Sequence, residues 1–77
     1  MLHQAMIDQQ AYYLLAKHKE RAQHYVAHGV DVGGNTAQLI EDYILTTGDA
    51  LVNAGCSSCI AQVLHTVYEL IKEYENG

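Results

Sequence analysis

Apolar side chains recur at spacings of three and four residues along most of this chain, and this periodicity constrains its fold more than any other feature. Such spacing places the apolar residues on one face of an α-helix. Proline, which removes a backbone donor and clashes with the preceding helical turn, is absent. The pattern therefore predicts three amphipathic helices, over residues 2–28, 36–54 and 57–75.

Glycine and small polar residues mark the expected ends of these helices. Gly29 suits a left-handed helix stop, and Asn35 suits the N-cap of the next helix, with Gln38 as its capping-box partner. Gly48 falls off the apolar stripe of the second stretch, where it is either a tolerated defect or the end of the helix. We expect a continuous or kinked helix there, and a third helix capped by Ser57.

These helices and their short connections predict an all-α, three-helix bundle that occupies residues 1–77 as a single domain. A chain of 77 residues buries a modest core, and domains of this size commonly gain stability from a metal, a disulfide or a partner subunit. The first helix would be roughly 40 Å long, which is long for so small a domain. We therefore expect it either to kink or to use part of its length for a partner.

One group of residues has the composition of a metal site. His24 and His28 lie four residues apart near the end of the first predicted helix, and Cys56 and Cys59 lie three apart near the start of the third. Histidines at this spacing share a helical face, and two thiolates at a helix N-terminus can bind one ion. Because two imidazoles and two thiolates form a tetrahedral zinc site, these four residues predict a structural His2Cys2 site for Zn²⁺.

The order His-x3-His followed about 27 residues later by Cys-x2-Cys resembles the N-terminal zinc-binding domain of retroviral-type integrases. The resemblance covers residues 24–59 and consists of this spacing. It implies a zinc ion held in a small helical bundle that self-associates. The acidic charge balance of the chain differs from that of a protein that handles DNA, so the resemblance does not imply integrase activity.

Two other interpretations explain the cysteine pair without a cofactor. Cys59 lies on the apolar stripe of its helix, where a buried free cysteine packs as a small hydrophobic side chain. Alternatively, Cys56 and Cys59 form a redox pair, although the Cys-x-x-Cys motif of thioredoxin-like proteins has a βαβ context that this sequence lacks. The sequence leaves zinc, packed thiols and a redox pair open.

Charged residues are few and mostly negative. Four lysines and arginines stand against nine aspartates and glutamates, which gives a net charge of −5 with neutral histidines. Nucleic-acid binding needs many cations to neutralise phosphates, so this composition argues against nucleic acid as a partner. Lys17 and Arg21 are expected on a solvated face that they share with His24 and His28. His18 falls on the apolar side and is expected to be hydrogen-bonded in the core or at its rim.

The sequence shows no signal for secretion or membrane insertion. No apolar run approaches the roughly 18 residues that span a bilayer, and the N-terminus lacks the charged and apolar regions of a signal peptide. We therefore expect a cytoplasmic protein, in the host cytoplasm or in a virion if the chain is viral. In that compartment the two cysteines are expected to be reduced or metal-bound rather than disulfide-linked.

The sequence also lacks recognisable catalytic machinery, since it has no nucleophile elbow, phosphate-cradling loop or triad. Phenylalanine and tryptophan are absent, but six tyrosines suit half-buried surfaces that pack against a partner. The sequence therefore predicts a non-enzymatic helical interaction or assembly protein that binds a protein partner or itself. Its size and acidity resemble those of bacteriophage-encoded virion components and host-factor binders. The alternatives are a zinc-stapled regulatory module and a thiol redox switch through Cys56 and Cys59.

Overall fold

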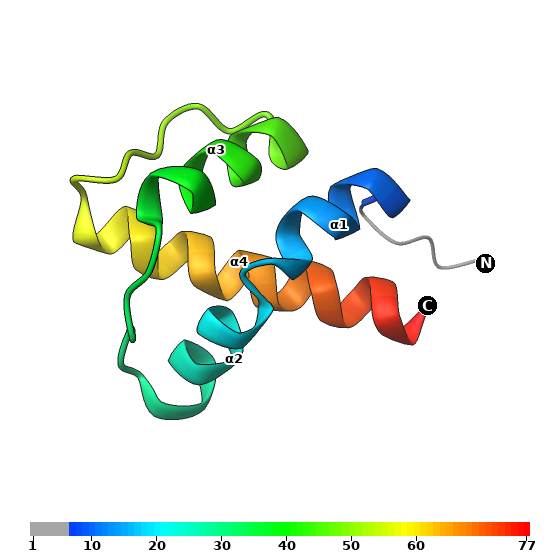
Figure 1. Cartoon of the computed structure of the whole chain (residues 1–77), viewed down its shortest axis with the longest axis horizontal. Helices are drawn as coiled ribbons and strands as arrows, with labels where there is room; N and C mark the ends of the chain where they lie inside the picture. Colours follow the sequence, from blue (N-terminus) through cyan, green and yellow to red (C-terminus); the bar gives the residue numbers. More distant parts are fainter. Residues whose placement is uncertain (1–6) are drawn as a thin grey trace.

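The computed structural model describes residues 7–77, and all regular secondary structure in that range is helical. The helices of the described range are α1 (Gln9–Ala16), α2 (Lys19–His28), α3 (Thr36–Thr47) and α4 (Ser57–Asn76). Figure 1 shows α4 running through the middle of the molecule, with α1 and α3 on one side of it and α2 on the other. The all-α class is thus confirmed, whereas the predicted number of three helices is wrong.

The difference in number arises because the predicted first helix is divided between α1 and α2. Lys17 is the C-cap of α1, and the N–H of His18 donates to the carbonyl of Leu15 at 2.9 Å, which closes a tight turn. No glycine or proline lies at this point. The ring of His18 instead lies 2.7 Å from the carboxylate of Asp42 in α3, a contact that only the tertiary fold provides. The start of the predicted helix, over residues 2–6, lies outside the described residues.

The other helix ends follow local signals more closely. Gly29 ends α2 in the left-handed conformation at φ 72°, as predicted. Gly48 does the same for α3 at φ 77°, so the expectation of a helix continuing to residue 54 is wrong. Asn35 caps α3 by accepting the Gln38 N–H at 3.1 Å. The predicted capping box is incomplete, because the Gln38 side chain donates to Asp42 at 2.9 Å.

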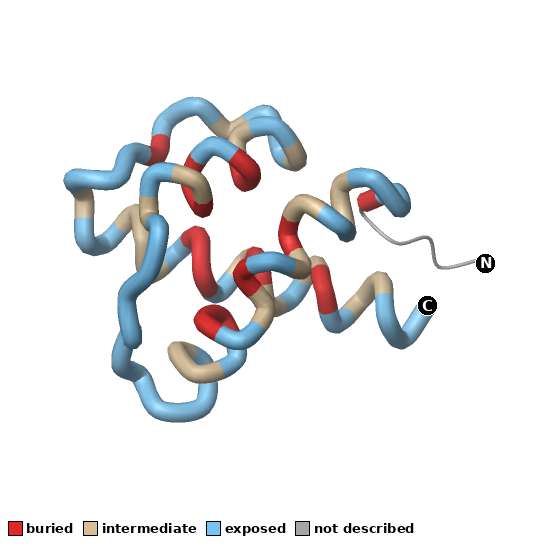
Figure 2. Tube along the Cα trace, viewed as in Figure 1, coloured by how far each residue is buried: buried red, intermediate tan, exposed pale blue. Residues whose placement is uncertain are grey.

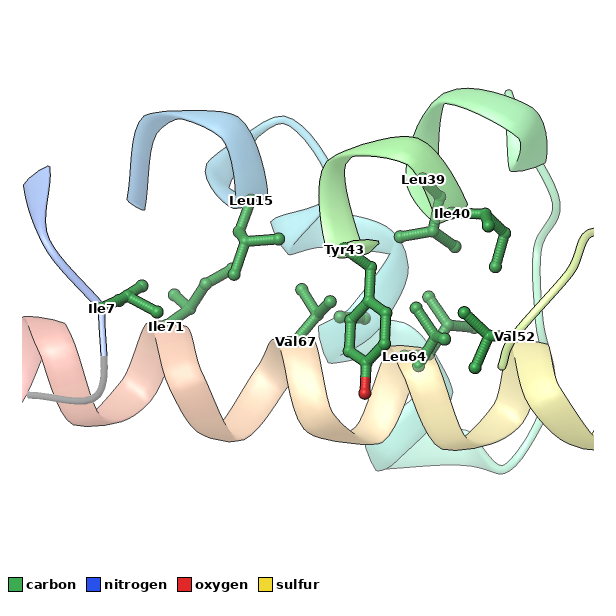
Figure 3. Close-up of a cluster of buried hydrophobic side chains, with 11 residues drawn as sticks. Ile7, Leu15, Leu39, Ile40, Tyr43, Val52, Leu64, Val67 and Ile71 are labelled. Carbon is green, nitrogen blue, oxygen red and sulfur yellow. The ribbon is translucent and has the colours of Figure 1, made fainter. Parts of the chain in front are cut away.

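The hydrophobic core forms where the apolar face of α4 meets the other three helices (Figure 2). α4 contributes a buried stripe at helical spacing, consisting of Val63, Leu64, Val67 and Ile71. Figure 3 shows side chains from the rest of the chain converging on this stripe. These buried partners are Ile7, Leu15, Ala22, Leu39, Ile40, Tyr43 and Val52. Because the core draws on every helix and on the connection before α4, the described residues pack around one shared centre.

α4 is the longest helix of the described range, with 20 residues. Its polar face makes it amphipathic, as expected of a helix that packs against others on one side. Within residues 7–77, no helix combines the length and the apolar character needed to cross a membrane.

The hydroxyl of Thr46 is buried near the end of α3 without a hydrogen-bond partner. An unsatisfied buried group of this kind costs about 1–3 kcal/mol. Valine keeps the branched shape and removes the hydroxyl, so Thr46→Val is expected to raise the free energy of unfolding by about 0.5–1 kcal/mol. Urea denaturation measures this change.

Thr47 provides the matched control for this substitution. Its hydroxyl donates to the Tyr43 carbonyl at 2.8 Å and accepts the Asp49 N–H at 3.1 Å. Thr47→Val removes both hydrogen bonds and is expected to lower the free energy of unfolding by about 1 kcal/mol. If the two valine variants changed stability in the same direction, the unsatisfied hydroxyl would not be the cause.

Candidate functional site

Three tyrosines gather where α1 lies beside the C-terminal part of α4 (Figure 1), and we call Tyr12, Tyr13 and Tyr74 the tyrosine cluster. The rings of Tyr12 and Tyr74 are stacked, with centroids 4.4 Å apart and planes at 16°. The ring of Tyr13 is 6.1 Å from that of Tyr12, and Tyr13 is 61% exposed. The cluster therefore combines a held aromatic pair with an aromatic side chain open to solvent.

Hydrogen bonds to a single carboxylate hold this arrangement. The Tyr12 hydroxyl and the Lys19 ammonium both donate to the same oxygen of Glu75, each at 2.6 Å. The hydrogen bond from Lys19, and then that from Tyr12, hold the pKa of Glu75 below its ordinary value. The hydrogen bond to Glu75 raises the pKa of Tyr12, because ionising the phenol would remove the donor. Glu75 thus links the first two helices to the last turn of α4.

A small hollow lies next to the cluster, on the side of α2. Its volume is about 140 Å³, and its lining residues are Lys19, Gln23, Tyr68, Ile71, Lys72, Glu75 and Asn76. The ammonium of Lys72 lies 5.9 Å from the centre of the Tyr68 ring, within the range of a cation–π interaction. The hollow shares Lys19 and Glu75 with the hydrogen bonds that hold Tyr12, so charged side chains connect it to the tyrosine cluster.

The four residues of the predicted zinc site occur in the structure as two pairs. The rings of His24 and His28 are 4.5 Å apart on α2, and Cys56 and Cys59 are joined as a disulfide. Within residues 7–77, no group of three or more His, Cys, Asp and Glu side chains is arranged to hold a metal ion. Zinc binds thiolates, and neither sulfur is a thiolate in this state. The His2Cys2 site stays a prediction.

The disulfide differs from the expectation of reduced or metal-bound cysteines. The N-cap of α4 is Cys56, and not Ser57 as predicted. The Cys59 N–H donates to the sulfur of Cys56 at 3.2 Å. Cys59 is half-buried and packs against the core, but it is not the free buried thiol of the packed-cysteine interpretation. The spacing of three residues in a first helical turn is what brings the two sulfurs together.

Sequence reasoning missed a buried polar group centred on Asp42 of α3, which is 1% exposed. Its carboxylate accepts from the His18 ring at 2.7 Å and from the Gln38 amide at 2.9 Å, and it lies 3.5 Å from the Lys17 ammonium. Burial alone would raise the pKa of Asp42, but these hydrogen bonds and the charge of Lys17 hold it below its ordinary value. The expectation of a hydrogen-bonded His18 in the core or at its rim is confirmed.

A second polar contact ties down the connection between α2 and α3. The Arg21 guanidinium donates to both oxygens of Asp31 at 2.8 Å and to the Thr36 hydroxyl at 2.9 Å. The hydrogen bond to Arg21 holds the pKa of Asp31 below its ordinary value. Arg21 is only 8% exposed, so its predicted place on a solvated face is wrong. Both polar groups link α2 or the turn before it to later elements, which gives them a structural role.

The three positions thus differ in exposure: the tyrosine cluster presents Tyr13 to solvent, the carboxylate of Asp42 is buried, and the cysteine pair lies at the far end of α4. Comparisons with known protein families, with curated proteins and with solved structures find no match to this chain.

Proposed function

We propose that this protein is a small, non-enzymatic helical module that binds another protein through the tyrosine cluster. The observation that carries the proposal is the exposure of Tyr13, which is 61% open to solvent beside the stacked pair of Tyr12 and Tyr74. Covering such an aromatic surface removes apolar area from water and favours association. In a bacteriophage, a module of this kind would serve as a virion component or as a host-factor binder.

The arrangement of the cluster also lowers the entropic cost of binding. Tyrosine offers a large contact area with few rotatable bonds. Tyr12 is already held by its stack on Tyr74 and its hydrogen bond to Glu75, so it has little further freedom to lose. The net charge of −5 favours a partner with a basic facing surface, because complementary potentials speed association and select partners.

Site-specific photo-cross-linking in the cells that express the protein tests this proposal. Photoreactive p-benzoylphenylalanine is placed at position 13 in one variant and at position 51 in a matched control, since Leu51 is 91% exposed on the connection between α3 and α4. We expect a discrete cross-linked product from position 13 that position 51 does not give. A product of twice the chain mass identifies a second copy as the partner. No product at position 13, or the same products at both positions, overturns the proposal.

Once the partner is identified, Tyr13→Ala measures how much the cluster contributes. We expect the dissociation constant to rise roughly 30-fold, which corresponds to about 2 kcal/mol for a central aromatic residue. The stability of the free protein should change by less than about 0.5 kcal/mol, because Tyr13 is mostly exposed. Unchanged affinity in the alanine variant would place the interface elsewhere on the molecule.

A further inference from the structure

The disulfide between Cys56 and Cys59 occupies the opposite end of α4 from the tyrosine cluster (Figure 1). Tyr74 follows Cys56 by 18 positions, which corresponds to about 27 Å along the helix axis. Any chemistry at the cysteines is therefore separate from the proposed binding surface. Both cysteines are half-buried rather than enclosed, so a small reagent can reach them.

The first helical turn holds the two cysteines within disulfide range without a change of backbone. Their Cα atoms are 5.2 Å apart, which lies within the usual range of roughly 4.4–6.8 Å for a disulfide. The Cys56 N–H donates to the Asn53 carbonyl at 3.3 Å, and the Ile60 N–H donates to the Cys56 carbonyl at 3.0 Å. These backbone hydrogen bonds do not involve the sulfurs, so the same turn accommodates a dithiol as well as a disulfide.

The surroundings of the two sulfurs are unequal. Cys56 is the N-cap of the 20-residue helix α4, and its sulfur accepts the Cys59 N–H at 3.2 Å and lies 3.3 Å from the Ser58 hydroxyl. The first turn of α4 has no acidic residue. When the pair is reduced, negative charge on the sulfur of Cys56 therefore meets two hydrogen-bond donors and the positive end of a helix dipole. Cys59 lies one turn further along, against the core.

We propose that Cys56 and Cys59 form a thiol–disulfide exchange site for low-molecular-weight disulfides, with Cys56 as the attacking sulfur and Cys59 as the resolving one. The Cys56 thiolate attacks one sulfur of the disulfide, which forms a mixed disulfide and releases the first thiolate. The Cys59 thiolate then attacks the sulfur of Cys56, which forms the intramolecular disulfide and releases the second. The protein loses two electrons and two protons, and the small disulfide becomes two thiols. The same steps in reverse reduce the protein.

The experiment uses the reduced full chain with oxidised glutathione as the probe and a metal chelator present throughout. Intact mass spectrometry follows the wild type and the single-cysteine variants Cys59→Ser and Cys56→Ser. We expect Cys59→Ser to accumulate a glutathione adduct about tenfold faster than Cys56→Ser. The wild type should convert to the intramolecular disulfide without accumulating an adduct. Equal rates for the two variants, or a wild type that keeps its adduct, overturns the proposal.

Alanine substitutions at Ser58 and at Ser57 distinguish an effect of the Ser58 hydroxyl on the reactivity of Cys56 from a general effect on the helix. Ser58→Ala removes a hydroxyl beside the Cys56 sulfur and should slow adduct formation several-fold in the Cys59→Ser background. Ser57→Ala, at the adjacent position, should leave that rate unchanged. Circular dichroism reports whether all variants keep their helices. Equal rates for the two alanine variants would contradict the assigned role of Cys56. Tyr13→Ala should not change any of these rates, so this test and the cross-linking test fail independently.

Discussion

Replacing Asp42 with alanine is expected to lower the free energy of unfolding by about 3 kcal/mol, measured by urea denaturation at neutral pH. The substitution leaves the buried His18 ring and the Gln38 amide without their acceptor. Asp42 is 1% exposed, so the two groups lose their acceptor in a site with little access to bulk water. A domain of this length has a total stability on the order of 5 kcal/mol, and the variant would lose much of it.

Glu41→Ala is the matched control, because Glu41 precedes Asp42 on α3, carries the same charge and is exposed. Its stability should stay within about 0.5 kcal/mol of the wild type. If both variants lost the same stability, the loss of a negative charge from α3 would explain it, and the buried hydrogen bonds would not.

The pH dependence of the same comparison tests the ionised state of Asp42. The pKa of Asp42 is lower in the folded protein than its ordinary value, so the unfolded chain binds the proton more readily. The stabilisation is therefore complete above the ordinary carboxyl pKa and is lost as the pH falls through the lowered one. The difference in the free energy of unfolding between the wild type and Asp42→Ala should become smaller over that acidic range. Asp31 and Glu75 also have lowered pKa values, but both proteins retain them.

Leu64→Ala is expected to lower the free energy of unfolding by about 3 kcal/mol, through lost apolar burial and the cavity that remains. Leu64 is 0% exposed and projects from α4 into the shared core (Figure 3). Thermal unfolding followed by circular dichroism measures the effect as a lower melting temperature. His65→Ala, at the next and exposed position of α4, should change the melting temperature little. Because alanine is the strongest helix former, helix propensity cannot cause such a loss, and comparable losses in both variants would mean that the burial of Leu64 is not the cause.

Local signals predict much of the fold. The helix expected over residues 57–75 occurs as Ser57–Asn76, because a strong apolar stripe follows a capping residue. Gly29 and Asn35 mark helix ends in the structure as in the sequence. At Gly48 the same backbone preference ends α3, although the apolar stripe continues beyond it and favours a longer helix.

The features that local signals do not predict depend on distant residues. The break at Lys17 and His18 coincides with a hydrogen bond between His18 and Asp42, which are 24 positions apart. The tyrosine cluster joins Tyr12 to Tyr74, and no periodicity relates the two. The burial of Arg21 depends on its pairing with Asp31 across a connection, and helical spacing alone predicts a solvated face for it instead. The spacing of residues within one helix does not show which side chains of a second helix will contact it.

The division of the N-terminal region into two helices has a consequence for motion. α1 and α2 have 8 and 10 residues, and isolated helices shorter than about 12–15 residues are marginal in water. Each therefore depends on its packing, and because the turn at Lys17 and His18 divides the two helices, we expect α1 to open while α2 stays in place. Local unfolding of α1 separates Tyr12 from Tyr74 and dismantles the surface. A bound partner would oppose that opening, so occupancy of the surface would appear as slower amide hydrogen exchange in α1.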